Sequence, residues 1–155
     1  MVLVPDELQL TAFVADALRA HDSETASLLR MLKSSLHNTA ITQGSPLDEQ
    51  ARITLYRKEI KQRREAAGIF AANGRPQLAA KEDAEAERIE EFLPKSASRE
   101  QIIDAAKEML PDIEKNSPSA KGVLIKLLRN KFGANADGGL IAEIATTMLL
   151  EWSNF

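Results

Sequence analysis

The apolar residues of this chain recur every three or four positions, and helix start and stop signals interrupt that pattern. The last segment is the clearest example, because Ile141, Ile144, Ala145, Met148 and Trp152 keep this spacing throughout. Such spacing places the residues on one face of an α-helix, whereas a half-buried strand alternates apolar and polar residues. The sequence has no alternating segment and no internal repeat. It therefore predicts an all-α protein.

Start and stop signals divide the periodic pattern into two groups of helices. The best boundary is Pro94-Lys95-Ser96-Ala97, after which Ser98 and Gln101 form a capping box. Before this boundary, the third helix is expected to begin at Ser45-Pro46 and to stop at Asn73-Gly74. We expect two small bundles, four helices in residues 1–94 and three helices in residues 98–155.

Composition excludes several classes of site. The 155 residues include no cysteine, which rules out disulfides, thiolate metal sites and a cysteine nucleophile. The segment MVLVPDELQL has neither the basic start nor the apolar core of a signal peptide, and no apolar run approaches the length of a membrane span. These features predict a soluble protein with a cytoplasmic location and no membrane partner.

Patterns that carry catalytic chemistry are scarce. There is no phosphate-binding loop, nucleophile elbow or HExxH pattern, and His21 and His37, on different predicted helices, are interpreted as surface or cap residues. The stretch GANADGG at 133–139 is interpreted as a turn with Asp137 as N-cap, and anion binding there is the alternative. We therefore predict no catalytic residue, no metal, no cofactor and no small-molecule substrate.

Charge is segregated along the middle of the chain. Residues 51–75 carry seven basic and two acidic side chains, whereas residues 76–93 carry two basic and six acidic ones. Arg63 stands out, because helical spacing puts it on the apolar side with Ile60 and Phe70. A buried arginine needs an acidic partner, or must keep its head at the rim. The candidates for structural ion pairs are Arg63, Glu59, Glu82 and Glu85.

The alternative is that basic residues face outward and bind the phosphates of a nucleic acid. On the sixth predicted helix, the competing interpretation is a solvated face whose cations suit the helix dipole. Both alternatives remain open from the residues alone. The candidate nucleic-acid-binding residues are Arg57, Lys58, Lys61, Arg64 and Arg75 around the third helix, and Lys121, Lys126, Arg129 and Lys131 on the sixth.

Two ordered blocks make a family resemblance visible. KEIKQRR at 58–64 and GRPQLAAKEDAEAERIEEFLPK at 74–95 resemble the YqeY family, and Ala136-Asp137-Gly138 matches again before the last helix. This family is the small-protein relative of the C-terminal tail of the GatB subunit of tRNA-dependent amidotransferases. The resemblance covers nearly the whole chain, and it implies an all-helical fold of four helices followed by three.

The resemblance also implies a function. It links the chain to amide-nitrogen transfer onto misacylated tRNA, a carbon–nitrogen ligase reaction with glutamine as nitrogen donor. The ATP-using site of that enzyme lies in a larger domain that has no counterpart here, and the tail's implied role is to hold tRNA. The expectation is thus a non-catalytic tRNA-associated module or an accessory of the amidotransferase. The alternative is a protein-interaction module that binds a partner protein through the third and fourth helices.

Three departures from the family pattern bear on RNA binding. Asn135 stands where a basic residue is expected before Ala136-Asp137-Gly138, and Lys121-Gly122 stands where Gly-Lys is expected. The connection after the first helix, residues 19–22, is poorer in lysine than the family pattern. Each change removes or moves positive charge, so it bears on where an RNA could bind.

Overall fold

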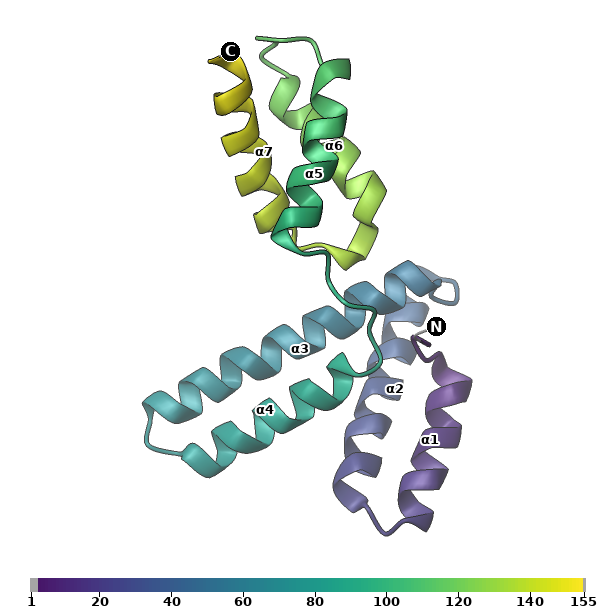
Figure 1. Ribbon diagram of the computed structural model, residues 1–155. Helices are drawn as coiled ribbons and strands as arrows, with labels where there is room; N and C mark the ends of the chain where they lie inside the picture. Colours follow the sequence, from purple (N-terminus) through teal and green to yellow (C-terminus); the bar gives the residue numbers. More distant parts are fainter. Residues whose placement is uncertain (1–2, 155) are drawn as a thin grey trace. The chain divides into compact units, whose positions relative to one another are not determined.

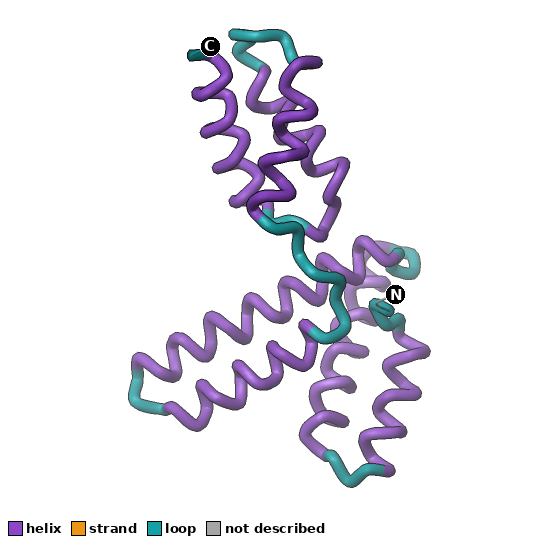
Figure 2. Tube along the Cα trace, viewed as in Figure 1, coloured by secondary structure: helices purple, strands orange, loops and turns teal. Residues whose placement is uncertain are grey.

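The computed structural model describes residues 3–154, and these form α-helices, two short 3-10 helices and loops (Figures 1 and 2). No strand occurs in this part of the chain, so the prediction of an all-α fold is confirmed. The chain divides into two compact units, Met1–Pro94 and Lys95–Phe155. Whether each unit folds independently stays a prediction.

The first unit contains two antiparallel helix pairs (Figure 1). Helix α1 (Glu7–Arg19) pairs with α2 (Ser23–Gln43), and α3 (Glu49–Ala72) pairs with α4 (Pro76–Glu90). The turn between α3 and α4 is tight because Gly74 has φ 69°, which suits glycine, and the Arg75 amide donates to the Phe70 carbonyl at 2.9 Å. The predicted stop at Asn73-Gly74 is confirmed.

The predicted start of the third helix is wrong by three residues. The Asp48 side chain accepts a hydrogen bond from the Ala51 amide at 2.8 Å, so Asp48 is the N-cap and α3 begins at Glu49. Ser45 instead stays in the connecting loop, where its hydroxyl accepts from the Gln43 side chain at 3.0 Å. The Asp48 carboxylate, which is closer than Ser45 to the apolar pattern of the helix, therefore caps α3 in place of Ser45.

An aromatic contact joins the two helix pairs of the first unit. Tyr56 of α3 is fully buried, and its hydroxyl donates to the Pro5 carbonyl at 2.7 Å. Its ring lies 6.4 Å from that of Phe92, which stacks on Phe13 of α1 at 5.9 Å between ring centroids. The segment before α1 is therefore tied to α3, and the chain after α4 is tied to α1.

The second unit packs three helices around one apolar core. These are α5 (Arg99–Met109), α6 (Ala120–Phe132) and α7 (Gly138–Ser153), with the 3-10 helices η1 (Leu110–Asp112) and η2 (Gly133–Asn135) between them. Ser98 and Gln101 form the predicted capping box, and Asp137 caps α7 by accepting from the Leu140 amide at 2.8 Å. The fully buried core includes Ile102, Leu124, Leu128, Ile141 and Ile144.

Three helix ends meet at one end of this unit. The Ala97 amide donates to the Asn135 carbonyl at 2.7 Å, which ties the start of α5 to the segment between α6 and α7. The N-termini of α5 and α7 and the C-terminus of α6 therefore lie together, as Figure 1 shows. This end carries two positive helix-dipole ends and the basic last turn of α6.

Candidate functional site

Arg63 is buried, with 6% of its surface exposed, where α2, α3 and α4 come together. Its Nη1 lies 2.7 Å from Glu59 Oε2 on α3, and its Nε lies 3.3 Å from Glu85 Oε2 on α4. Its Nη2 reaches Met31 of α2 at 3.3 Å from the sulfur. The guanidinium is thus satisfied on three sides, which compensates for the cost of burying a charge.

A second hydrogen bond completes this buried network. Ser35 of α2 donates to Glu59 Oε1 at 2.8 Å, so Glu59 holds Ser35 with one oxygen and Arg63 with the other. Glu82, the remaining candidate for these pairs, makes no ion pair with a described residue. Arg63 therefore acts in packing and is not accessible to a ligand.

Other cations of α3 are paired along the outside of the helix hairpin. Arg64 bonds Asp83 at 2.9 Å and Glu90 at 3.4 Å, both from α4, and these contacts raise the pKa of Arg64, with the Asp83 hydrogen bond as the largest cause. Lys61 lies 3.9 Å from Glu65. The acidic helix that follows the basic segment therefore neutralises part of its charge.

The remaining candidates around α3 do not form one charged surface. Arg57 is half-buried, and its Nη2 lies 3.4 Å from the Pro94 carbonyl; burial lowers the pKa of this guanidinium. Lys58 and Arg75 are exposed and make no ion pair with any described residue, but Arg75 lies at the far end of α3, at the start of α4. Of the candidates on α3, Lys58 is exposed without an ion pair to a described residue, whereas Lys61 is paired with Glu65.

The four candidates on α6 do not all share one surface. Lys126 and Arg129 are three residues apart and share an exposed face, and neither makes an ion pair with a described residue. Lys131 lies 3.4 Å from Glu108 of α5. Lys121 lines a pocket on another side of the helix. Within residues 3–154, Lys126 and Arg129 are therefore neighbouring cations of α6 for which no ion pair is found.

Arg129 also lies close to the start of α7. Its Nη2 would be 3.4 Å from a Cβ placed on Gly138, the first residue of that helix. Gly122 lies one turn before Lys126 on the same face of α6, and a Cβ there would meet nothing within 4 Å. This face is positively charged, open and next to a helix N-terminus, which favours anions.

The described residues contain no group of three or more His, Asp or Glu side chains placed to hold a metal ion. No helix in residues 3–154 combines the length and the apolar character needed to span a membrane. Sequence reasoning missed one feature, an apolar pocket beside Trp152. The signal available in the sequence was Trp152 itself, at the end of the α7 seam.

Comparison with known proteins identifies the family. The model of the family described as Yqey-like protein matches residues 7–149. The chain belongs to this family. Among curated relatives, a Lachancea thermotolerans protein is 33% identical over 106 residues, and one from Saccharomyces cerevisiae strain YJM789 is 32% identical over 112 residues. Both carry the name "Altered inheritance of mitochondria protein 41, mitochondrial".

These alignments cover 66% and 71% of this chain, but only 57% and 60% of the length of the two relatives. The predicted cytoplasmic location is contradicted, because the relatives are named as mitochondrial proteins. The sequence reasoning failed here because it used the absence of one kind of targeting signal, the secretory one, as evidence for the cytoplasm.

Proposed function

We propose that this chain is a non-catalytic tRNA-associated module, an accessory linked to tRNA-dependent amide transfer, and that its second unit makes the phosphate contacts. The observation that carries the proposal is the exposed, unpaired Lys126 and Arg129 on one face of α6. Membership of the YqeY-like family supports the link to the amidotransferase, through the kinship of this family with the GatB tail.

The surroundings of this cation pair suit a phosphate backbone. The N-terminus of α7 adds a positive dipole end beside Arg129, and Gly122 leaves room on the same face for close approach. Asn135 lies in η2 beside this end, at the position where the family resemblance leads us to expect a basic residue. Only two side chains would contact phosphates, and the surface around them carries little further positive charge. We therefore expect tRNA to bind weakly and with little sequence preference.

The alternative is a protein-interaction module that uses α3 and α4. The paired side chains of these helices weigh against it, because Arg63 and Arg64 are bonded to Glu85, Asp83 and Glu90 of the same hairpin. A partner protein that used Arg63 or Arg64 would have to replace these internal contacts.

The test is binding of bulk tRNA to the full chain at several salt concentrations. A Lys126→Glu, Arg129→Glu double variant is compared with a Lys58→Glu, Lys61→Glu variant, because both change the net charge equally. We expect the α6 variant to weaken binding and to reduce the slope of log K against log salt by about 2, and the α3 variant to change both only slightly.

The comparison separates three outcomes. Loss of binding in the α3 variant alone would move the interface to α3. Equal losses in both would indicate attraction by overall charge without a defined interface. A wild-type chain that binds no tRNA at low salt would contradict the proposal altogether.

A further inference from the structure

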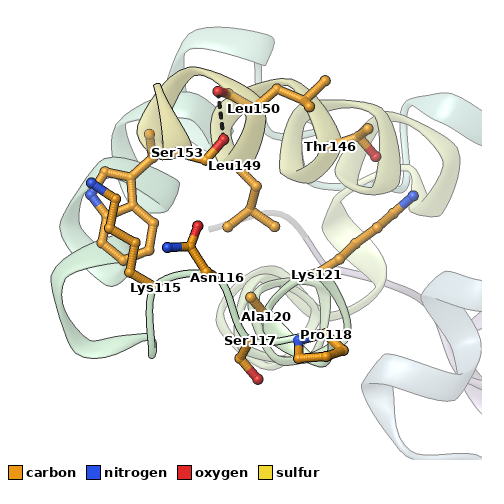
Figure 3. Close-up of a pocket in the computed structure, with 11 residues that line it drawn as sticks. Lys115, Asn116, Ser117, Pro118, Ala120, Lys121, Thr146, Leu149, Leu150 and Ser153 are labelled. Carbon is orange, nitrogen blue, oxygen red and sulfur yellow. Dashed lines mark hydrogen bonds between the residues drawn. The ribbon is translucent and has the colours of Figure 1, made fainter. Parts of the chain in front are cut away.

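The second unit has an open pocket of about 280 Å³ between α7 and the loop that leads into α6 (Figure 3). Its apolar surface comes from Pro118 and Ala120 on one side and from Leu149, Leu150 and Trp152 of α7 on the other. Leu150 is 62% exposed, so the pocket opens to solvent. We call this feature the Trp152 pocket.

Every charged residue that lines the Trp152 pocket is a lysine, namely Lys115 or Lys121. The Lys115 ammonium lies 5.7 Å from the centre of the Trp152 ring, a cation–π distance. Lys121 makes no ion pair with a described residue. Glu151 is the nearest acid along α7, and it lines an adjacent pocket with Lys107 and with Trp152 itself. The rim of the Trp152 pocket is therefore positively charged and its floor is apolar.

The polar groups of α7 offer no donors here. The Thr146 hydroxyl donates to the Ala142 carbonyl at 2.8 Å, and the Ser153 hydroxyl donates to the Leu150 carbonyl at 3.0 Å. The Asn116 amide, which Figure 3 shows between Leu149 and the loop, makes no hydrogen bond with a described residue. Two lysines and the Asn116 amide remain as donors for an occupant, together with the Ser117 hydroxyl, which shares a hydrogen bond with the Ser119 hydroxyl. Such donors bind anionic groups, of which the carboxylates of a protein come with apolar side chains that suit the floor of the pocket.

We propose that the Trp152 pocket docks an acidic segment of a partner protein. One or two apolar side chains of that segment would contact Leu149, Leu150 and Trp152, and its carboxylates would lie beside Lys115 and Lys121. The volume lies just below the range of 300–1,000 Å³ typical of small-molecule sites. An open pocket of this size fits side chains that project from a partner's surface, and its charge selects an acidic partner.

The proposal goes beyond tRNA association and uses different residues. Lys121 lies on the pocket side of α6, whereas Lys126 and Arg129 occupy the exposed face assigned to RNA. The two lysines on one helix therefore provide a matched pair of charge reversals. Lys121→Glu tests the pocket, and Lys126→Glu is the control with the same change of charge.

The test uses the full chain and synthetic peptides without tryptophan. The probe peptide carries leucines four residues apart and glutamates at most other positions. One control peptide has alanine in place of leucine, and the other has lysine in place of glutamate. Trp152 is the only tryptophan in the sequence, so its emission reports binding beside its ring. Trp152 also lines the adjacent pocket with Glu151, and the response of the Lys121→Glu variant assigns the binding to the Trp152 pocket, because Lys121 lines that pocket alone.

We expect saturable binding of the probe peptide, with weak or no binding of either control. Lys121→Glu is expected to raise the dissociation constant about tenfold, because an attraction becomes a repulsion, whereas Lys126→Glu changes it less than about twofold. Leu150→Ala removes apolar contact area at an exposed position and is expected to raise it about tenfold. Since that variant keeps its charge, it should leave tRNA binding unchanged.

Several results would overturn the proposal. One is an unchanged Trp152 emission at millimolar probe peptide. Another is equal binding of either control peptide, or an equal effect of Lys121→Glu and Lys126→Glu. Self-association that Leu150→Ala abolishes, without any response to the probe peptide, would assign the pocket to a second copy of this chain.

Discussion

Replacing Arg63 with alanine should destabilise the first unit severely. The change leaves Glu59 and Glu85 without their cation, and it removes the arginine stem from between the helices. Losing one partner of a buried ion pair costs roughly 3–5 kcal/mol in the free energy of unfolding. Arg63 is 6% exposed and the Glu59 side chain 13%, so this range applies. The Glu85 side chain is 25% exposed and can regain water, which favours the lower half, about 3–4 kcal/mol.

Lys58→Ala is the matched control on the same helix. Lys58 is exposed and makes no ion pair with a described residue, so this change should shift the free energy of unfolding by less than about 0.5 kcal/mol. A second comparison is Arg63→Met combined with Glu59→Gln and Glu85→Gln, which removes all three charges and keeps most of the volume. This variant should recover much of the loss, because no buried charge remains unpaired.

Urea unfolding provides the measurement, and the chain contains two intrinsic probes. Its single tyrosine, Tyr56, lies in the first unit, and its single tryptophan, Trp152, lies in the second. Near-ultraviolet circular dichroism of Tyr56 should show the lowered midpoint of Arg63→Ala, while the Trp152 emission midpoint stays unchanged. Equal stability of the Arg63→Ala and Lys58→Ala variants would refute the reasoning, since it would mean that the guanidinium is solvated.

Two further predictions concern Tyr56 and the segment between the units. Tyr56→Phe should cost about 1–2 kcal/mol near neutral pH, because the buried Pro5 carbonyl loses its donor. Burial raises the pKa of Tyr56, so the contribution of the neutral tyrosine to stability is complete below the usual tyrosine pKa of about 10 and is lost as pH rises through the folded-state pKa. Urea midpoints measured up to about pH 11 should therefore fall more steeply in the wild type than in Tyr56→Phe. Parallel curves for the two proteins would contradict this prediction. Limited trypsin digestion should cut first after Lys95, which is exposed and outside the helices, and early cuts within helices would count against two separable units.

Much of the helical arrangement could be predicted because capping and periodicity are local properties. Ser98 with Gln101, the stop at Gly74 and the α7 seam each depend on residues close in sequence, and the structure agrees with them. The start of α3 was misplaced because Ser45 and Asp48 both qualify as N-caps. Competition between nearby caps depends on how the helix packs, which the local pattern does not contain.

The candidate site was harder to predict because its charges are balanced by residues from other helices. The tight turn at Gly74 sets the register of α4 against α3. That register places Glu85 beside Arg63 and Asp83 beside Arg64, while Glu82 is left without either. The Trp152 pocket depends on a loop in which Asn116 has φ 68°, and the sequence pattern does not indicate that conformation.

The buried network around Arg63 has an evolutionary consequence. Its groups come from three helices, with Ser35 and Met31 on α2, Glu59 on α3 and Glu85 on α4. A single substitution at position 63 leaves both Glu59 and Glu85 without their cation. Loss of either glutamate alone still leaves Arg63 with one acidic partner. Descendants of this chain should therefore lose an acid before they lose the arginine, and substitutions at positions 59, 63 and 85 should be correlated across the family.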